Sequence, residues 1–213
     1  MKWLAGVALL VLLLPSPSLG GIIIYTDPTA FQSAIAGGLV LDFDSVDTSG
    51  GRVPIGGSEF PPFSFSSPLA GDPGKLWNEP LGFFYSSNFL STGERPFDCC
   101  DANQDDLAVT ITGNWRAFGM ETVDNGGGSP ESITFIGDLG VLHVHSEIPS
   151  FIGIVTDSDF IRQVVIDELA DDSDDVGYDN FTVGNPVPVP EPASLLLFST
   201  GLVGLNALRK RRG

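Results

Sequence analysis

Residues 151–166 read FIGIVTDSDFIRQVVI. Two short runs rich in β-branched and apolar residues, 151–155 and 161–166, flank a turn made mainly of Asp and Ser. Runs of this kind are typical of β-strands, and Asp and Ser favour the turns that join strands. The stretch therefore predicts two short strands connected by a turn.

The same pattern extends to both sides of this stretch. Short β-rich runs separated by Gly, Pro, Asp and Ser occupy residues 21–25, 39–43, 63–65, 83–85, 107–112, 133–136, 141–146 and 181–183. About ten short strands with few helices indicate an all-β fold, a two-sheet sandwich of the jelly-roll type. One short helix is expected on a sheet edge, with Asp27 as N-cap, Pro28 in the first turn, Phe31 and Ile35 on one face, and Gly37-Gly38 as the stop.

The two ends of the chain differ in composition from the middle. Residues 1–20 combine Lys2, an unbroken apolar run from 4 to 14 and small residues at 18 and 20, the pattern of a secretory signal peptide. Residues 186–213 contain Pro190-Glu191-Pro192, an uncharged run from 193 to 208, and the basic cluster Arg209, Lys210, Arg211 and Arg212. A helix over the uncharged run would be roughly 24 Å long and would span a bilayer marginally, and its basic end would stay in the cytoplasm. This leaves residues 21–185 as the exported β-sandwich domain.

This order of tripeptide, apolar segment and terminal Arg/Lys cluster resembles the PEP-CTERM sorting signal of exported proteins in exopolysaccharide-producing Gram-negative bacteria. The resemblance implies that the chain is inserted in the inner membrane and is a substrate of the protease-transpeptidase exosortase. The same tail is also known as an ice-binding-protein C-terminal domain. A plain C-terminal membrane anchor is the alternative interpretation. Residues 117–120, 151–157, 164–166 and 177–184 are similar to jelly-roll ectodomains that often accompany this tail.

The exported part is strongly acidic. Residues 21–189 hold five Lys and Arg against 26 Asp and Glu, a net charge of −21, whereas the whole chain carries −17. A surface of this sign repels nucleic acid and anionic headgroups, and it favours cations. A nucleic-acid partner is therefore not expected.

Acidic residues crowd the segment before the last predicted strand. Hard oxygen ligands with loose geometry suit calcium, although the spacing is not that of an EF-hand. In many carbohydrate-binding-like jelly rolls a structural calcium lies between an early acidic residue and the final strand, so the resemblance implies a pairing of Asp42 or Asp44 with Asp179. A solvated acidic turn is the alternative. The predicted calcium ligands are Asp42, Asp44, Asp171, Asp174, Asp175 and Asp179.

Histidine and cysteine residues give weaker indications of a site. His143, His145 and Glu147 alternate, so in a strand they share one face, as a transition-metal site or as the polar side of a half-buried strand. Cys99 and Cys100 are adjacent, and in an oxidising compartment they form a strained vicinal disulfide, pair with another chain or stay free.

No sequence motif indicates catalysis. Gly-x-Ser-x-Gly, P-loop and dinucleotide-binding patterns are absent from the sequence. Trp77 and Trp115 could stack on sugar rings from loops, or belong to the core. The sequence therefore predicts a non-catalytic protein, and the resemblance to PEP-CTERM proteins implies an envelope or matrix location with exopolysaccharide as the ligand. A glycan-active hydrolase is the main alternative, and an ice-binding protein is disfavoured because a periodic Thr array is lacking.

Overall fold

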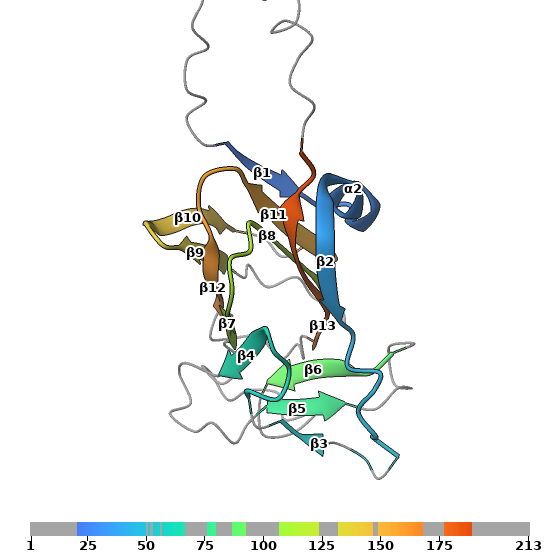
Figure 1. Ribbon diagram of the computed structural model, residues 1–213. Helices are drawn as coiled ribbons and strands as arrows, with labels where there is room; N and C mark the ends of the chain where they lie inside the picture. Colours follow the sequence, from blue (N-terminus) through green and yellow to red (C-terminus); the bar gives the residue numbers. More distant parts are fainter. Residues whose placement is uncertain are drawn as a thin grey trace, which may run out of the picture.

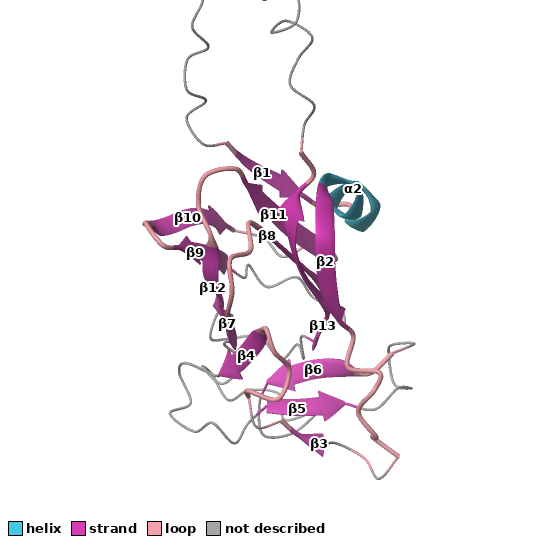
Figure 2. Cartoon of the chain, in the orientation of Figure 1, coloured by secondary structure: helices cyan, strands magenta, loops and turns pink. Residues whose placement is uncertain are grey.

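The computed structural model describes residues 21–49, 51, 53–55, 57–66, 76–79, 87–92, 107–123, 132–146, 149–167 and 177–188. Within these residues the chain forms one helix and two antiparallel sheets (Figure 1; Figure 2). The all-β, two-sheet prediction is confirmed. The strand predicted at residues 83–85 lies outside the described residues.

The larger sheet is built from eight strands. Their bounds are β1 Ile22–Tyr25, β2 Ile35–Leu41, β3 Val53–Pro54, β5 Leu76–Glu79, β6 Phe89–Thr92, β8 Ala117–Val123, β11 Phe151–Thr156 and β13 Gly177–Pro186. The order is β1-β11-β8-β13-β6-β5-β3, and β2 pairs with β13 off this path. One edge of β13 pairs with β8, and the other edge pairs first with β6 and then with β2.

The smaller sheet has five strands. These are β4 Phe63–Ser66, β7 Leu107–Ile111, β9 Ser132–Gly137, β10 Gly140–His145 and β12 Ile161–Asp167, in the order β10-β9-β12-β7-β4. From β7 onward the chain changes sheet at nearly every connection, the arrangement of a jelly-roll-like sandwich. β9 alternates between buried and half-buried residues, as expected of a strand with one face on the core.

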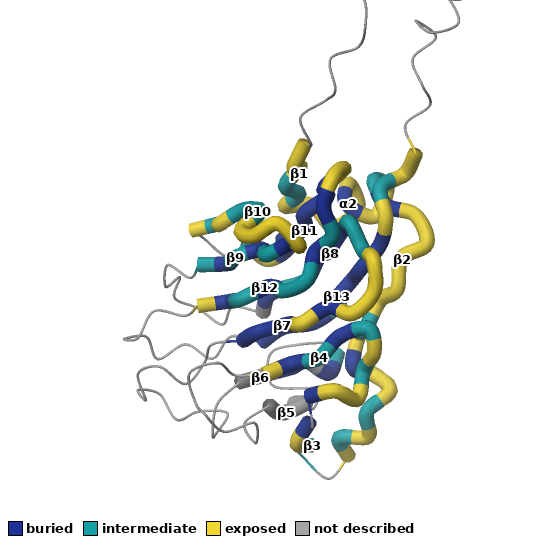
Figure 3. Tube along the Cα trace, turned by 60° about the vertical axis from the view of Figure 1, so that its left-hand side comes forward, coloured by how far each residue is buried: buried dark blue, intermediate teal, exposed yellow. Residues whose placement is uncertain are grey.

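Aromatic rings from both sheets meet in the core around Phe181. Phe181 is fully buried, and its ring centroid lies 5.0 Å from that of Phe65, 6.0 Å from Phe63 and 6.3 Å from Phe118. Phe43, from the loop after β2, meets Phe181 edge-on at 5.9 Å. The core strands appear as the dark segments of Figure 3, in contrast to the exposed β2 along one side.

The helix, α2 Pro28–Ala34, begins as the sequence predicts. Asp27 is its N-cap, and the Oδ1 atom of Asp27 accepts a hydrogen bond from the amide of Ala30 at 2.7 Å. The predicted stop at Gly37-Gly38 is wrong, because Ile35 already has extended backbone and opens β2, where it pairs with Pro186. Pairing with β13 therefore ends the helix earlier than the glycines would.

Helix α2 packs on the face of the larger sheet and not on its edge, which corrects the predicted position. The fully buried Phe31 ring lies over Gly119 of β8 and Gly153 of β11, where an added Cβ would approach Phe31 atoms to 2.8 and 2.6 Å. Only glycine permits so close an approach. All six residues of β11 are buried, because the core covers one face and α2 covers the other.

The histidines of β10 face the core, opposite to the predicted polar face. His143 pairs with Phe135 and His145 with Ile133, and both partners are fully buried, so the imidazoles share the inner side. Val141 and Val144 are 64% and 55% exposed on this edge strand. A bulge between Val141 and His143 shifts the register, which the alternating pattern of the sequence did not reveal.

Candidate functional site

A buried carboxyl group in the central strand is the strongest candidate site. Asp179 of β13 is only 1% exposed. Its Oδ2 atom accepts a hydrogen bond from the Ser87 hydroxyl at 2.7 Å, and its Oδ1 atom accepts one from the amide of Asn180 at 2.7 Å. Asn180 has a φ of 52°, in the left-handed region, and the register with β8 shifts between Asp179 and Thr182. This bulge turns the Asp179 side chain toward the start of β6.

Two further carboxylates belong to this network. The side-chain amide of Asn180 donates to Glu121 Oε2 of β8 at 2.9 Å. Asp44, in the loop after β2, accepts a hydrogen bond from the amide of Asn88 at 3.0 Å. We call Asp44, Ser87, Glu121, Asp179 and Asn180 the carboxylate network.

Asn88 fixes the loop that holds Asp44. The side chain of Asn88 donates to the carbonyl oxygens of Phe43 at 3.2 Å and Val46 at 3.0 Å, and it accepts from the Thr48 hydroxyl at 3.1 Å. A single buried amide therefore ties residues 43–48 to the start of β6. The position of Asp44 relative to Asp179 depends on this amide.

Burial raises the pKa of Asp179 to about 6, because a carboxylate loses its hydration inside the protein. The hydrogen bonds from Ser87 and from the Asn180 amide act in the opposite direction, and the negative charges of Asp44 and Glu121 raise the pKa further. The site thus concentrates negative charge around a desolvated carboxyl group. A cation there would relieve both the desolvation cost and the repulsion.

The predicted calcium ligands are only partly brought together. The negative charge of Asp44 acts on Asp179 and raises its pKa, so the two carboxyl groups lie near each other. Asp42 is exposed and accepts a hydrogen bond from the amide of Asp44 at 3.2 Å. Asp171, Asp174 and Asp175 lie outside the described residues. Among the residues that the structure describes, no group of three His, Cys, Asp or Glu side chains has the geometry of a metal site.

The histidine pair is half-buried and close together. The ring centroids of His143 and His145 are 5.9 Å apart. Burial lowers the pKa of His143, and the neighbouring His145 lowers it further. Glu147, the third residue of the predicted set, is outside the described residues.

The two predicted sugar-stacking residues lie on different elements. Trp115 follows β7, donates its indole N–H to the carbonyl of Thr112 at 3.0 Å and packs against the core. These contacts describe a structural role. Trp77 lies on β5, where it pairs with Pro54 and Ser91.

Cys99 and Cys100 lie outside the described residues, as do the tripeptide at 190–192 and the basic cluster at 209–212.

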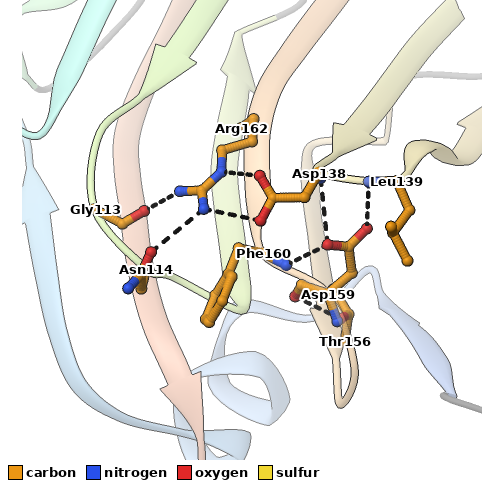
Figure 4. Close-up of polar contacts among 8 residues, drawn as sticks. All are labelled: Gly113, Asn114, Asp138, Leu139, Thr156, Asp159, Phe160 and Arg162. Carbon is orange, nitrogen blue, oxygen red and sulfur yellow. Dashed lines mark hydrogen bonds and ion pairs between the residues drawn. The ribbon is translucent and has the colours of Figure 1, made fainter.

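A second polar network joins three turns (Figure 4). The Asp159 carboxylate accepts hydrogen bonds from the amides of Asp138, Leu139 and Phe160 at 3.2, 3.2 and 2.8 Å. Arg162 donates to both carboxylate oxygens of Asp138, at 2.5 and 2.9 Å, and to the carbonyl of Gly113. Because its carboxylates are engaged by amides and a guanidinium, this network is a structural clamp for the turns.

Ser87 and Glu121 were not predicted as members of the carboxylate network. Both stand outside any recognisable motif, and only the strand pairing brings them to Asp179. Asn180 belongs to the acidic segment, but its left-handed backbone became evident only in the structure.

Comparisons with known proteins add a family match at the end of the chain and distant structural likenesses. No curated protein matches the sequence significantly. The chain is similar to a family 29 carbohydrate-binding module (9% identity, 74% of this chain and 99% of that chain, TM-score 0.35) and to the K2 cleaved adhesin domain of Lys-gingipain (12%, 69% and 97%, 0.36). It is also similar to an exo-β-agarase, of which it spans 26%, at 12% identity, 74% of this chain and a TM-score of 0.35. These likenesses are too distant to transfer a function.

The described residues contain no helix long and apolar enough to cross a membrane, and the predicted tail helix lies outside them. The family model of the PEP-CTERM protein-sorting motif matches residues 188–212. That match begins two residues after the end of β13. The chain therefore ends in a PEP-CTERM protein-sorting motif, which marks it as an exported protein.

Proposed function

We propose that this chain is a non-catalytic sandwich protein that an exosortase sorts through the inner membrane to the cell envelope or the extracellular matrix. The sorting motif at residues 188–212 is the observation on which the proposal rests. The tripeptide at 190–192 follows β13 by only three residues, so the sandwich lies directly next to the proposed processing point.

Replacing Pro190, Glu191 and Pro192 by Ala is expected to prevent this sorting. In the producing organism, the variant should accumulate in the membrane fraction at its unprocessed size, while the wild type reaches the envelope or the medium. Cell fractionation with immunoblotting measures both. A Val187→Ala variant, which lies just outside the matched motif, serves as the control and should be sorted normally. Normal sorting of the triple variant would contradict the proposal.

The burial of Asp179 supports a non-catalytic role. A raised carboxyl pKa is what a glycosidase requires of its general acid. A general acid must also reach the leaving group of the substrate, and Asp179 is 1% exposed and bonded to Ser87 and Asn180. The buried carboxyl group of Asp179 is therefore better placed to bind a cation, as a carboxylate, than to donate a proton to a sugar.

We propose further that the carboxylate network binds calcium. Asp44 and Asp179 would supply oxygen ligands, with Asp171, Asp174 and Asp175 as the predicted remainder. The support is the desolvated carboxyl of Asp179 between two other acidic groups, an arrangement that a divalent cation stabilises. The cation would tie the loop after β2 to the central strand.

The ligand that we propose for the exported domain is the exopolysaccharide of the producing organism. With a net charge of −21 over residues 21–189, an anionic polymer would bind only where calcium bridges the two charges. Trp77 is the proposed stacking residue.

Co-sedimentation with extracted exopolysaccharide tests this ligand. We expect binding in millimolar calcium, loss of binding with a chelator if the polymer is anionic, and much weaker binding by a folded Trp77→Ala variant. A wild type that does not sediment with the polymer in calcium would refute the polysaccharide proposal, and unchanged binding by Trp77→Ala would exclude that residue as the contact.

For Trp115→Ala we expect a lower melting temperature, because its hydrogen bond to Thr112 and its core contacts are lost.

A further inference from the structure

We propose that the turns next to the two chain termini lie on the surface of the bilayer that holds the sorting tail, so that the sandwich docks on lipid before it is processed. The proposal rests on the proposed function of the tail. Three turns form this surface, at residues 112–116, 138–139 and 157–160, and we call them the terminal turns.

Backbone hydrogen bonds connect the terminal turns to both ends of the domain. The amide of Asp157 donates to the carbonyl of Gly21, the residue before β1, at 3.3 Å. The amide of Arg116 donates to the carbonyl of Gly184, near the end of β13, at 3.1 Å. In Figure 1, β1 begins and β13 ends at the same end of the molecule, far from β3 and β5. The turns at 112–116 and 157–160 therefore belong to the end of the sandwich from which the tail departs, and the Asp159 carboxylate joins the turn at 138–139 to them through the amides of Asp138 and Leu139.

The connection to the tail is short enough to keep this end of the domain close to a membrane. β13 ends at Pro186 and the uncharged run begins at residue 193, a separation of seven residues. Fully extended, these seven residues span about 25 Å at most. The headgroup layer accounts for roughly 5–8 Å of that distance. With the uncharged run in the hydrocarbon layer, the terminal turns are within reach of the lipid surface.

Apolar side chains are exposed at this end. Leu139 is 90% exposed at the tip of the β9–β10 turn, and Val187, directly after β13, is 42% exposed. Ile22 and Ile23 of β1 are 40% and 54% exposed. The Asp159 carboxylate accepts a hydrogen bond from the amide of Leu139 at 3.2 Å, so the turn presents the Leu139 side chain in a fixed position (Figure 4). A leucine held out of the core in this way gains from insertion into the apolar boundary of a bilayer.

Two arginines lie at this end of the domain. The guanidinium carbons of Arg116 and Arg162 lie 5.1 and 5.3 Å, respectively, from the ring centroid of Phe160. These are two of only five basic residues between positions 21 and 189. Arginine with an aromatic ring and exposed apolar side chains suits the interfacial layer, where phosphates meet hydrocarbon. The same turns carry Asp138, Asp157 and Asp159, and Arg162 is paired with Asp138, so the exposed apolar side chains and not a net positive charge carry the proposed attraction to lipid.

Lipid quenching of a fluorophore on full-length protein tests the docking. In a Cys99→Ser/Cys100→Ser background, Leu139→Cys carries the label, and Ser58→Cys, an exposed position between β3 and β4, is the matched control. The protein is reconstituted in vesicles of phosphatidylethanolamine and phosphatidylglycerol that contain nitroxide-labelled lipid. We expect at least threefold stronger quenching at position 139 than at position 58. Equal melting temperatures of the two labelled proteins confirm that both are folded.

The outcomes separate the two proposals. If the chain does not float with the vesicles, the membrane role of the tail is wrong and the docking proposal falls with it. If the chain floats but positions 139 and 58 are quenched equally, the tail is an anchor and the docking proposal is wrong. A blue-shifted emission at position 139 without lipid quenching would also overturn it, and would indicate a contact with protein, such as a second copy of the chain.

Discussion

The Asp179→Asn variant is expected to be about 2 kcal/mol more stable than the wild type at pH 7 when calcium is absent. The pKa of Asp179 rises from 3.8 to about 6 in the folded protein, and each pKa unit corresponds to roughly 1.4 kcal/mol. Because the folded state holds the proton more tightly than the unfolded state, stability falls as the pH rises from about 4 to 6 and stays low above that range. Asparagine removes the charge and keeps the shape of the side chain, but its NH2 group replaces one of the two oxygens that accept hydrogen bonds. This loss, together with solvent screening, reduces the gain of about 3 kcal/mol that the pKa shift alone would give.

Calcium should narrow the difference between the two proteins. Binding to the native state raises stability by mass action, so the wild type should gain stability in millimolar calcium while Asp179→Asn should not. Urea unfolding of the exported domain at pH 4, 5, 6 and 7, with calcium or with a chelator, measures both effects. The advantage of the variant in the chelator should shrink toward pH 4, where the wild-type carboxyl is protonated.

An exposed carboxylate provides the control. Asp167→Asn, at the exposed end of β12, should change the stability by less than about 0.5 kcal/mol at each pH. If Asp179→Asn destabilises the domain in the chelator at pH 7, the prediction that the buried carboxylate destabilises the folded state is wrong. If calcium leaves the unfolding curve of the wild type unchanged, the calcium proposal is wrong.

The Phe181→Ala variant should lose about 3–5 kcal/mol of stability, a large part of the total for a domain of this size. Phe181 is fully buried, and its ring contacts Phe43, Phe63, Phe65 and Phe118, which come from both sheets and from the loop that holds Asp44. Its removal leaves a cavity at the junction of the two sheets. Urea unfolding followed by circular dichroism measures the loss.

Leu139→Ala is the matched control for Phe181→Ala. Leu139 is 90% exposed, so its truncation should change stability by less than about 0.5 kcal/mol. A small effect at Phe181 would show that the two sheets do not pack through this ring. A large effect at Leu139 would show that this side chain has a structural role, which would weaken its assignment to a lipid-facing turn.

The fold could be predicted because the strands are short and are regularly separated by the turn-forming residues Gly, Pro, Asp and Ser. Residues 151–156 and 161–167 form strands close to the predicted bounds, and Asp27 with Pro28 marked the start of α2. The end of α2 could not be predicted from local signals, because the pairing of Ile35 with Pro186 joins residues far apart in the sequence. The histidine face was missed for a similar reason: a bulge at Val141 shifts the register of β10 against β9.

The candidate site was predicted only in outline. The resemblance paired Asp42 or Asp44 with Asp179, and in the structure the charge of Asp44 acts on Asp179, whereas the calcium site itself stays a prediction. Ser87 and Glu121 join them through strand pairing between distant segments, and single-sequence patterns do not encode such contacts. The sorting motif was readable in full, because a linear signal depends on order and composition and not on tertiary structure.

Mass spectrometry of the protein recovered from the cell envelope and the medium determines whether an exosortase processes the chain. We expect a mature chain that begins at Gly21 and ends near Pro190-Glu191-Pro192, with the uncharged run and the basic cluster removed. Recovery of released protein with an intact C-terminus through Arg212 would contradict this expectation.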